Sequence, residues 1–272
     1  MTRIEDVLAA AKEQGRAALI GYLPVGYPSV EGSLEAMTAL VESGVDIVEV
    51  GFPYSDPLMD GPVIQAAAQH ALANGVRLRD VFRAVEAVTA AGGAAVVMSY
   101  WNPILAYGVD RFAADLAAAG GSGIITPDLI PDEAGAWLSA ADAHGLCPIF
   151  LLAPSSTADR IALTTSACRG FVYAASLMGV TGERTSVGEA AGALVARVRE
   201  ATSESQLPIC VGLGVSNREQ AAQVAAFADG VIVGSALVKA LDPSRPFSDA
   251  LTSLRAGARE LRAGVEEGRT RR

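Results

Sequence analysis

Short apolar runs alternate with longer amphipathic or alanine-rich segments along nearly the whole chain. This alternation predicts a parallel sheet, because parallel strands need crossover connections, which are usually helices. Eight strands are expected, at residues 18–22, 47–51, 95–100, 123–126, 148–152, 171–174, 209–212 and 230–233. Helices are expected between and after them, at residues 30–43, 63–74, 80–91, 110–119, 131–143, 157–167, 187–202, 217–227 and 248–265. Asp80, Thr157 and Asn217 stand near the starts of three of these helices, where such side chains cap the first turn.

Eight pairs of strand and helix in 272 residues fit a closed barrel. An open doubly wound sheet would show a similar alternation, but no G-x-G-x-x-G motif stands between a strand and its helix. Residues 4–14 predict an extra helix before the first strand, and no linker or low-complexity segment divides the chain. We therefore expect residues 1–272 to form a single domain of the α/β class, a (β/α)8 TIM barrel with an extra N-terminal helix.

Composition and charge argue against several classes of protein. With 51% hydrophobic residues the chain can bury a large core without disulfides. Its three cysteines are odd in number and have no CxxC spacing, which is typical of a protein in a reducing compartment. The net charge of −9 disfavours binding to nucleic acids or anionic membranes. The start lacks the apolar region of a signal peptide, and glycines and a proline break the uncharged stretch 87–109, which favours a short buried strand followed by a loop over a membrane span. We therefore expect a cytoplasmic protein.

The second expected strand leads into a segment rich in carboxylates, EVGFPYSDPLMDGP at residues 49–62. Glu49 lies within the strand, so it points either into the barrel or toward the helix layer, and a carboxylate is costly in either place. Apolar surroundings would raise its pKa and suit it to general acid/base catalysis. The alternative is a structural carboxylate bonded to a neighbouring strand or loop. Asp60 alone is ambiguous, because it could cap the helix that begins near Pro62.

Glycines recur after the last three expected strands, at residues 179–182, 212–214 and 234. Glycine-rich loops in this part of a barrel, followed by a short helix such as 235–240, hold phosphate through backbone N–H groups. The sequence therefore predicts a phosphorylated substrate.

Some reaction types are disfavoured by residues that the sequence lacks. Lys12 and Lys239 are the only lysines, and neither follows a strand as a Schiff-base lysine would. His70 and His144 fall in helical segments without Cys or His at ligand spacing, which argues against zinc sites and Ser-His-Asp triads. The chemistry that remains is carboxylate acid/base catalysis on a phosphorylated ligand, without a metal or a covalent intermediate.

The segment 49–62 also resembles a known family, the alpha subunit of tryptophan synthase, around that family's two catalytic acids. Further matches follow in the family's order: YWNPIL at 100–105, PDL at 127–129, Tyr173 with residues 176–182, and GSALVK at 234–239. The resemblance implies retro-aldol cleavage of indole-3-glycerol phosphate to indole and glyceraldehyde 3-phosphate. It also implies that indole passes to a beta subunit containing pyridoxal phosphate, in an alpha2beta2 heterotetramer, with no cofactor or metal in this chain itself.

The resemblance assigns roles to individual residues. Glu49 is the expected acid/base, and Asp60 is expected to stabilise positive charge on the indole N–H. Tyr22, where many relatives carry Phe, is expected to line the substrate pocket together with Tyr100 and Tyr173. The residues expected to bind the substrate at and around its phosphate are Thr181, Gly182, Gly212, Leu213, Gly214, Gly234 and Ser235. Contact with the partner is assigned to Pro53, Asp56 and Pro57.

Two other functions remain open at this point. One is a lyase of the same lineage that works without a partner, and the other is a non-catalytic phosphate-binding barrel that acts as a regulator. The joint presence of Glu49 and Asp60 argues against the regulator. A sugar-phosphate isomerase would share the barrel and the phosphate site, but its usual Lys, His and Glu have no clear place here.

Overall fold

A computed structural model describes residues 2–175, 184–212 and 214–268. Within these ranges nine parallel strands form one sheet, in the order β5-β4-β3-β2-β1-β9-β8-β7-β6. The strands are β1 (Ala18–Pro24), β2 (Ile47–Gly51), β3 (Ala94–Met98), β4 (Gly123–Ile125), β5 (Cys147–Ile149), β6 (Leu151–Leu152), β7 (Val172–Ala175), β8 (Ile209–Gly212) and β9 (Gly230–Val233).

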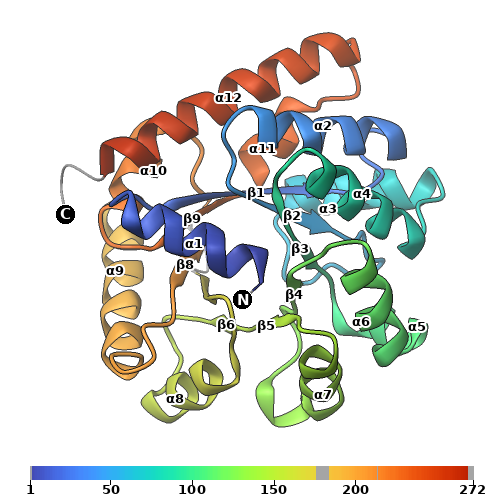
Figure 1. The fold of residues 1–272 in the computed structure, drawn as a ribbon. Helices are drawn as coiled ribbons and strands as arrows, with labels where there is room; N and C mark the ends of the chain where they lie inside the picture. The colour runs from blue at the N-terminus through green and yellow to red at the C-terminus, as the bar shows by residue number, and fades with distance from the viewer. Residues whose placement is uncertain (1, 176–183, 213, 269–272) are drawn as a thin grey trace.

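The two edges of this sheet are the two halves of one extended segment. β5 pairs with β4, β6 pairs with β7, and only Phe150 separates β5 from β6. The chain itself therefore closes the sheet into a barrel, which is visible as a ring of strands in Figure 1. The single strand expected at 148–152 is divided because its first half bonds to β4 and its second half bonds to β7. The TIM barrel expected from the alternation is confirmed.

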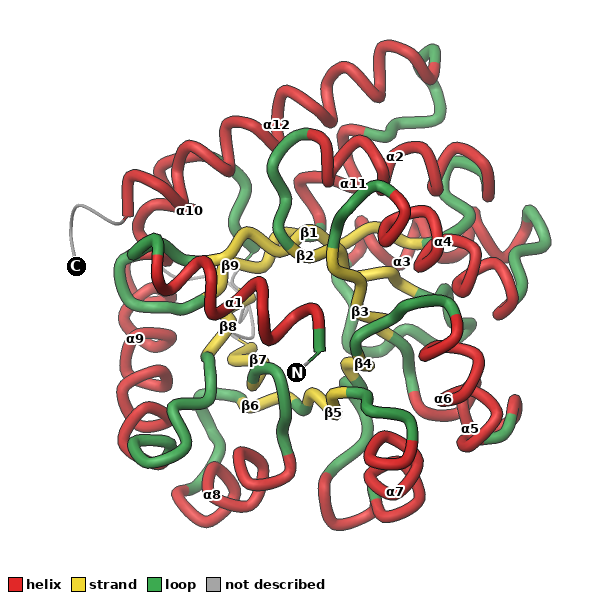
Figure 2. The backbone as a smooth tube through the Cα atoms, viewed as in Figure 1, coloured by secondary structure: helices red, strands yellow, loops and turns green. Residues whose placement is uncertain are grey.

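The helices surround the strands, as Figure 2 shows. They are α1 (Arg3–Glu13), α2 (Val30–Glu42), α3 (Pro62–Ala73), α4 (Leu78–Ala90), α5 (Trp101–Tyr107), α6 (Val109–Ala118), the 3-10 helix η1 (Pro131–Glu133), α7 (Gly135–Ala143), α8 (Ala158–Ala167), α9 (Arg184–Ala201), α10 (Arg218–Ala225), α11 (Ser235–Ala240) and α12 (Phe247–Glu267). Among the described helices, none combines the length and the apolar character that crossing a bilayer requires.

Local chemistry explains several of the helix starts. Thr157 accepts a hydrogen bond from the Arg160 amide at 3.2 Å, and Asn217 accepts one from the Gln220 amide at 2.9 Å, so both cap their helices as expected. The expectation for Asp80 is wrong: α4 begins at Leu78, and Asp80 lies in its first turn. There the Asp80 carboxylate accepts a hydrogen bond from the Arg77 amide at 2.9 Å.

The expectation of a loop after the third strand is also wrong, because residues 101–107 form α5. Pro103 lies in the first turn of this helix. The amides of a first turn have no intrahelical acceptor, so a proline there costs no helix hydrogen bond.

Two hydrophobic layers hold the barrel together. One fills the space between strands and helices and includes Val48 and Val50; the other fills the barrel and includes Ile20 and Ile47. Helix α1 belongs to the inner layer through Ile4, Leu8 and Ala11. It crosses the ring of strands in Figure 1 and contacts their N-terminal ends, where the Thr2 hydroxyl lies 3.2 Å from the Cys147 sulfur. The extra N-terminal helix therefore closes that end of the barrel and leaves the carboxyl ends of the strands for the site.

An ion-pair network fixes the strand that carries Glu49. Asp46, just before β2, binds Arg16 at 2.8 Å and Arg262 of α12 at 3.0 Å, and it accepts the Leu19 amide at 2.8 Å. Partial burial protects these bonds from solvent screening. The network ties β1, β2 and α12 together.

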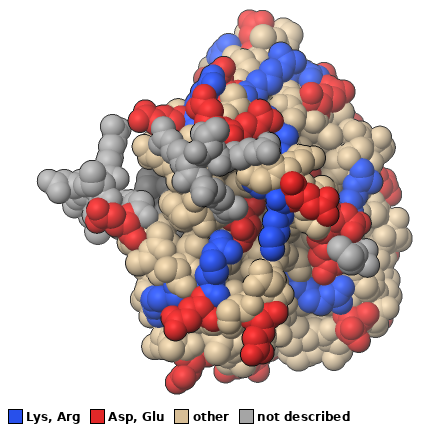
Figure 3. Space-filling model, turned by 60° about the vertical axis from the view of Figure 1, so that its left-hand side comes forward, with Lys and Arg blue, Asp and Glu red and all other residues tan. Residues whose placement is uncertain are grey.

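Elsewhere acidic and basic side chains are interspersed, as on the face shown in Figure 3.

Candidate active site

Glu49 points into the barrel. It alternates with Val48 and Val50 of the outer layer and shares the side of β2 that carries Ile47. Its exposed fraction is 1%, and its buried Oε1 has no hydrogen-bond partner among the residues that the structure describes. Burial raises the pKa of Glu49 to about 8, because a carboxylate loses its hydration there. The alternative of a structural carboxylate bonded to a neighbouring strand therefore has no support in the described structure.

Asp60 lies in the loop after β2, held against the end of β3. The Tyr100 hydroxyl donates to its Oδ2 at 3.3 Å, and the Met59 amide donates to the same hydroxyl at 2.8 Å. Burial raises the pKa of Asp60 to about 6, and the bond from Tyr100 opposes that rise. The residue that precedes α3 as its cap is Gly61, with no side-chain hydrogen bond, so Asp60 does not cap this helix. The two carboxyls thus have different pKa values.

Two tyrosines extend over glycines of neighbouring strands. A Cβ atom on Gly51 would lie 2.5 Å from the Tyr22 hydroxyl oxygen, and one on Gly212 would lie 2.4 Å from that of Tyr173. Only glycine leaves this space open for the phenol rings. Burial raises the pKa of both tyrosines, and the charges of Glu49 and Asp60 add to the rise.

Because the charges of both carboxyls act on both tyrosines, the four side chains lie in one neighbourhood. With Tyr100 they form a cluster of five polar groups at the carboxyl end of the barrel: Tyr22, Glu49, Asp60, Tyr100 and Tyr173. The structure therefore brings together the residues assigned to acid/base catalysis and to the substrate pocket.

The described positions assigned to phosphate follow two adjacent strands. Gly212 ends β8, which pairs with β9, while Gly234 and Ser235 lie at the start of α11 directly after β9. Gly214 has φ +69°, a left-handed conformation that suits glycine. Thr181, Gly182 and Leu213 lie outside the described residues. The first amides of α11 have no acceptor within the helix, and they follow the carboxyl end of β9, at the end of the barrel that bears the carboxyls.

The three positions assigned to a partner differ in accessibility. Pro53 is buried within the chain, whereas Asp56 is exposed and Pro57 is half-buried. Asp56 and Pro57 border a cavity of about 390 Å³ between this loop and α3. Leu58 next to them is 88% exposed, and Leu105 and Ile130, which follow β3 and β4, are also exposed. Sequence reasoning missed these three apolar side chains, because exposure depends on how the loops lie in the folded chain.

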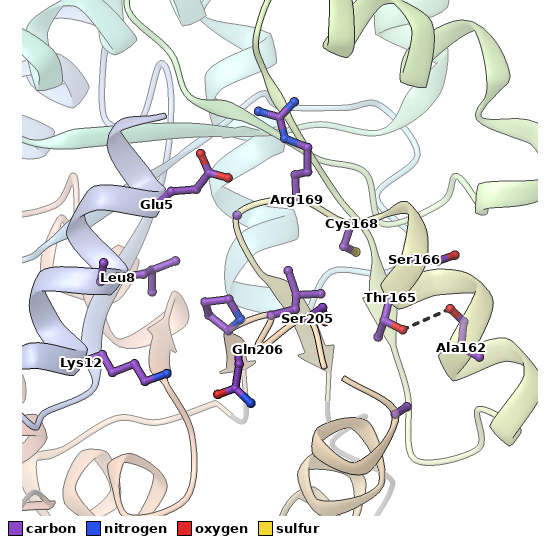
Figure 4. Close-up of a pocket in the computed structure, with 15 residues that line it drawn as sticks. Glu5, Leu8, Lys12, Ala162, Thr165, Ser166, Cys168, Arg169, Ser205 and Gln206 are labelled. Atoms are coloured by element: carbon purple, nitrogen blue, oxygen red, sulfur yellow. Dashed lines mark hydrogen bonds between the residues drawn. The ribbon is translucent and has the colours of Figure 1, made fainter. Parts of the chain in front are cut away.

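A larger cavity of about 640 Å³ lies at the opposite end of the barrel, between α1, α8 and the segment before β8 (Figure 4). Lys12, Arg169 and Gln206 are among its lining residues. It contains none of the residues assigned above. Across the described ranges, no cluster of three or more His, Cys, Asp or Glu side chains is arranged to hold a metal ion.

The comparisons with known proteins agree on one family. A family model described as tryptophan synthase alpha chain matches residues 8–266. The tryptophan synthase alpha chain of Mycobacterium avium is 63% identical over 266 residues, covering 98% of this chain and 95% of the relative. That of Nocardia farcinica is 60% identical over 264 residues, covering 97% and 96%.

Solved structures agree with the sequences. A crystal structure of tryptophan synthase from M. tuberculosis in an aminoacrylate-bound form matches with TM-score 0.88 and 58% identity, covering 97% of this chain and 100% of that chain. Tryptophan synthase subunit alpha from Legionella pneumophila matches with TM-score 0.86 and 34% identity, covering 98% and 99%. These matches extend over nearly the full length of the chains compared, and they confirm the resemblance found in segment 49–62. The chain belongs to the tryptophan synthase alpha chain family.

Proposed function

We propose that this chain cleaves indole-3-glycerol phosphate to indole and glyceraldehyde 3-phosphate by a retro-aldol reaction, as a lyase of tryptophan biosynthesis. The observation that carries the proposal is the pair of buried carboxyls with separated pKa values, about 8 for Glu49 and about 6 for Asp60. At neutral pH Glu49 is mainly protonated and Asp60 is mainly ionised. The site thus offers a proton donor and an anion at the same end of the barrel.

The reaction needs one proton delivered and one removed. Glu49 donates its proton to the indole ring carbon that bears the side chain, and the ring nitrogen then carries positive charge. The Asp60 carboxylate stabilises that charge at the ring N–H. The Glu49 carboxylate next takes the proton of the adjacent side-chain hydroxyl while the carbon–carbon bond breaks and its electron pair returns to the ring. An aldehyde forms, indole is released, and Glu49 is protonated again, so one carboxyl serves both steps.

The ends of β8 and β9 are proposed to hold the phosphate. Backbone amides at Gly212, Gly214, Gly234 and Ser235 would bind its oxygens, with Thr181, Gly182 and Leu213 completing the cradle. In this proposal the phosphate binds on the α11 side of the barrel, and the reacting carbon lies next to Glu49 on β2.

A beta subunit is the proposed partner, in an alpha2beta2 assembly in which pyridoxal phosphate belongs to the beta subunit. Exposed apolar side chains at the catalytic end support this proposal, because water disfavours them and a partner would cover them. Leu58 borders the same cavity as Asp56 and Pro57, and Leu105 and Ile130 are exposed after β3 and β4. We further propose that residues 1–272 act as one domain in the cytoplasm.

The test is an assay of the purified chain with indole-3-glycerol phosphate, in which indole and glyceraldehyde 3-phosphate are both measured with and without beta subunit. We expect slow cleavage by the chain alone and faster cleavage in the complex. Leu58→Asp should weaken the response to beta subunit, whereas Leu163→Asp, at an exposed leucine on α8, should not. No release of either product would refute the proposed reaction, and equal rates with and without beta subunit would favour a lyase that works alone.

A further inference from the structure

Tyr22 carries a hydroxyl, a hydrogen-bond donor, at the end of a largely buried side chain. The side chain is 8% exposed, and its hydroxyl forms no hydrogen bond with any residue in the described part of the chain. A polar group in a binding site that no side chain or backbone group engages is available to a ligand.

The position of the ring defines which part of a ligand would meet this hydroxyl. Tyr22 on β1 stands in register with Glu49 on β2. At its near end, a Cβ on Gly234 would lie 3.5 Å from the Tyr22 Cδ1 atom, whereas at its far end the hydroxyl lies over Gly51. The phenol therefore extends from the proposed phosphate cradle toward the acid that acts on the reacting carbon.

The hydroxyl stays protonated in this environment. Burial raises the pKa of Tyr22, and the negative charges of Asp60 and Glu49 raise it further. A protonated phenol donates one hydrogen bond and needs an acceptor. The indole N–H of the proposed substrate is a donor, and the phosphate belongs at the other end of the ring beside Gly234. The hydroxylated three-carbon chain between them supplies the remaining oxygen acceptors.

We propose that the Tyr22 hydroxyl donates a hydrogen bond to a hydroxyl oxygen of the substrate's three-carbon chain and makes the site selective for a hydroxylated chain. This inference rests on the proposed function and adds a specificity-determining residue to it. Tyr22 holds the chain so that the hydroxyl next to the indole ring faces Glu49, and Tyr22 itself transfers no proton.

The test compares two ligands that differ only in the chain hydroxyls. Indole-3-glycerol phosphate carries them, and indole-3-propyl phosphate lacks them. We would measure kcat/KM for the first and the inhibition constant of the second, for the wild type, Tyr22→Phe and the control Tyr107→Phe. The Tyr107 hydroxyl donates a hydrogen bond to Asp115 on α6, and the Tyr107 ring contacts Arg111 and Phe82. None of these residues belongs to the cluster of five polar groups.

Loss of one neutral hydrogen bond should lower kcat/KM of Tyr22→Phe by about threefold to tenfold, mainly through KM, while the inhibition constant changes less than about twofold. Tyr107→Phe should change neither constant. Equal loss for both ligands would mean that Tyr22 only shapes the pocket, and no loss for either would mean that its hydroxyl is unused; both results overturn the inference. A wild type that releases no indole overturns the proposed function and this inference with it, whereas cleavage by the wild type with equal effects on the two ligands overturns the inference alone.

Discussion

Tyr100 donates its hydroxyl proton to Oδ2 of Asp60 over 3.3 Å, and the same hydroxyl oxygen accepts the Met59 amide at 2.8 Å. These two bonds hold the catalytic loop against the start of α5. They also stabilise the ionised form of Asp60, since a hydrogen bond to a carboxylate lowers its pKa. Tyr100 is therefore a positioning residue for Asp60 as well as part of the pocket wall.

The pH dependence of cleavage should follow the two carboxyls. Activity requires ionised Asp60, with pKa about 6, and protonated Glu49, with pKa about 8, so kcat/KM should be bell-shaped with limbs near these values. Tyr100→Phe removes the bond that lowers the pKa of Asp60, so its acid limb should move to higher pH while the alkaline limb stays. A pH–rate series on both proteins checks this. Tyr27→Phe, outside the cluster, serves as the control, and an unmoved acid limb in Tyr100→Phe would contradict the assignment.

Glu49→Gln should abolish most of the cleavage. An amide keeps the shape of the side chain but neither donates nor removes a proton on the catalytic timescale, so the loss should be at least about 100-fold to 10,000-fold. Indole release is the measurement, with circular dichroism to verify folding. Glu86→Gln, at an exposed glutamate on α4, should leave the rate unchanged. Near-normal turnover by Glu49→Gln would refute the mechanism.

Glu49 should also make the fold less stable at alkaline pH. Its pKa is about 8 in the fold against the ordinary 4.5, so between these values the unfolded chain ionises it while the folded chain keeps it protonated. The free energy of unfolding therefore falls as pH rises through this window, by an amount on the order of a few kcal/mol, and levels off above about 8. Urea unfolding at pH 6 and pH 8.5 should show Glu49→Gln gaining stability relative to the wild type at the higher pH. A constant difference between the two proteins would mean that Glu49 is not buried in a protonated form.

Gly212→Ala should damage the site with little effect on the rest of the barrel. The new Cβ would lie 2.4 Å from the Tyr173 hydroxyl oxygen, closer than any real contact, so the phenol must leave its place. We expect a loss of kcat/KM of about tenfold or more, because a misplaced group in a pocket costs this much or more. Gly257→Ala, on α12 with nothing within 4 Å of the added Cβ, is the matched control and should be neutral or slightly stabilising. Full activity in Gly212→Ala would show that Tyr173 has another place to sit.

Two substitutions at Gly234 distinguish the effect of added side-chain volume on substrate binding from the effect of added negative charge. A Cβ there meets only ordinary contacts, at 3.5 Å from Ile64 and Tyr22, so Gly234→Ala should be tolerated. Gly234→Asp adds negative charge where the phosphate is proposed to bind and should raise KM at least about tenfold by repulsion. The affinity for indole, which has no phosphate, should stay unchanged in both variants, as measured by competition. If Gly234→Asp raised KM no more than Gly234→Ala, the phosphate would have to lie elsewhere.

Much of the fold follows from patterns that are local in the chain. Alternating strands and helices predicted the barrel and its extra helix, and the caps at Thr157 and Asn217 were recognised from residue type. One departure has a long-range cause, and the other has a local cause. Residues 147–152 divide into β5 and β6 because the first half pairs with β4 and the second half pairs with β7. Residues 101–107 form a helix despite Pro103, because the chain places the proline in the first turn.

For the candidate site too, some features follow from the sequence and others arise only in the tertiary structure. Residue type and order within the chain identified Glu49, Asp60 and the glycines after the late strands, because the chemistry requires a carboxyl or a bare backbone at a strand end. The direction in which Glu49 points, its missing hydrogen-bond partner and its raised pKa depend on side chains from other strands. The same holds for the tyrosine rings over Gly51 and Gly212, and for the exposure of Leu58. Burial and electrostatic fields are sums over neighbours that are distant in sequence, so they arise only when the barrel closes.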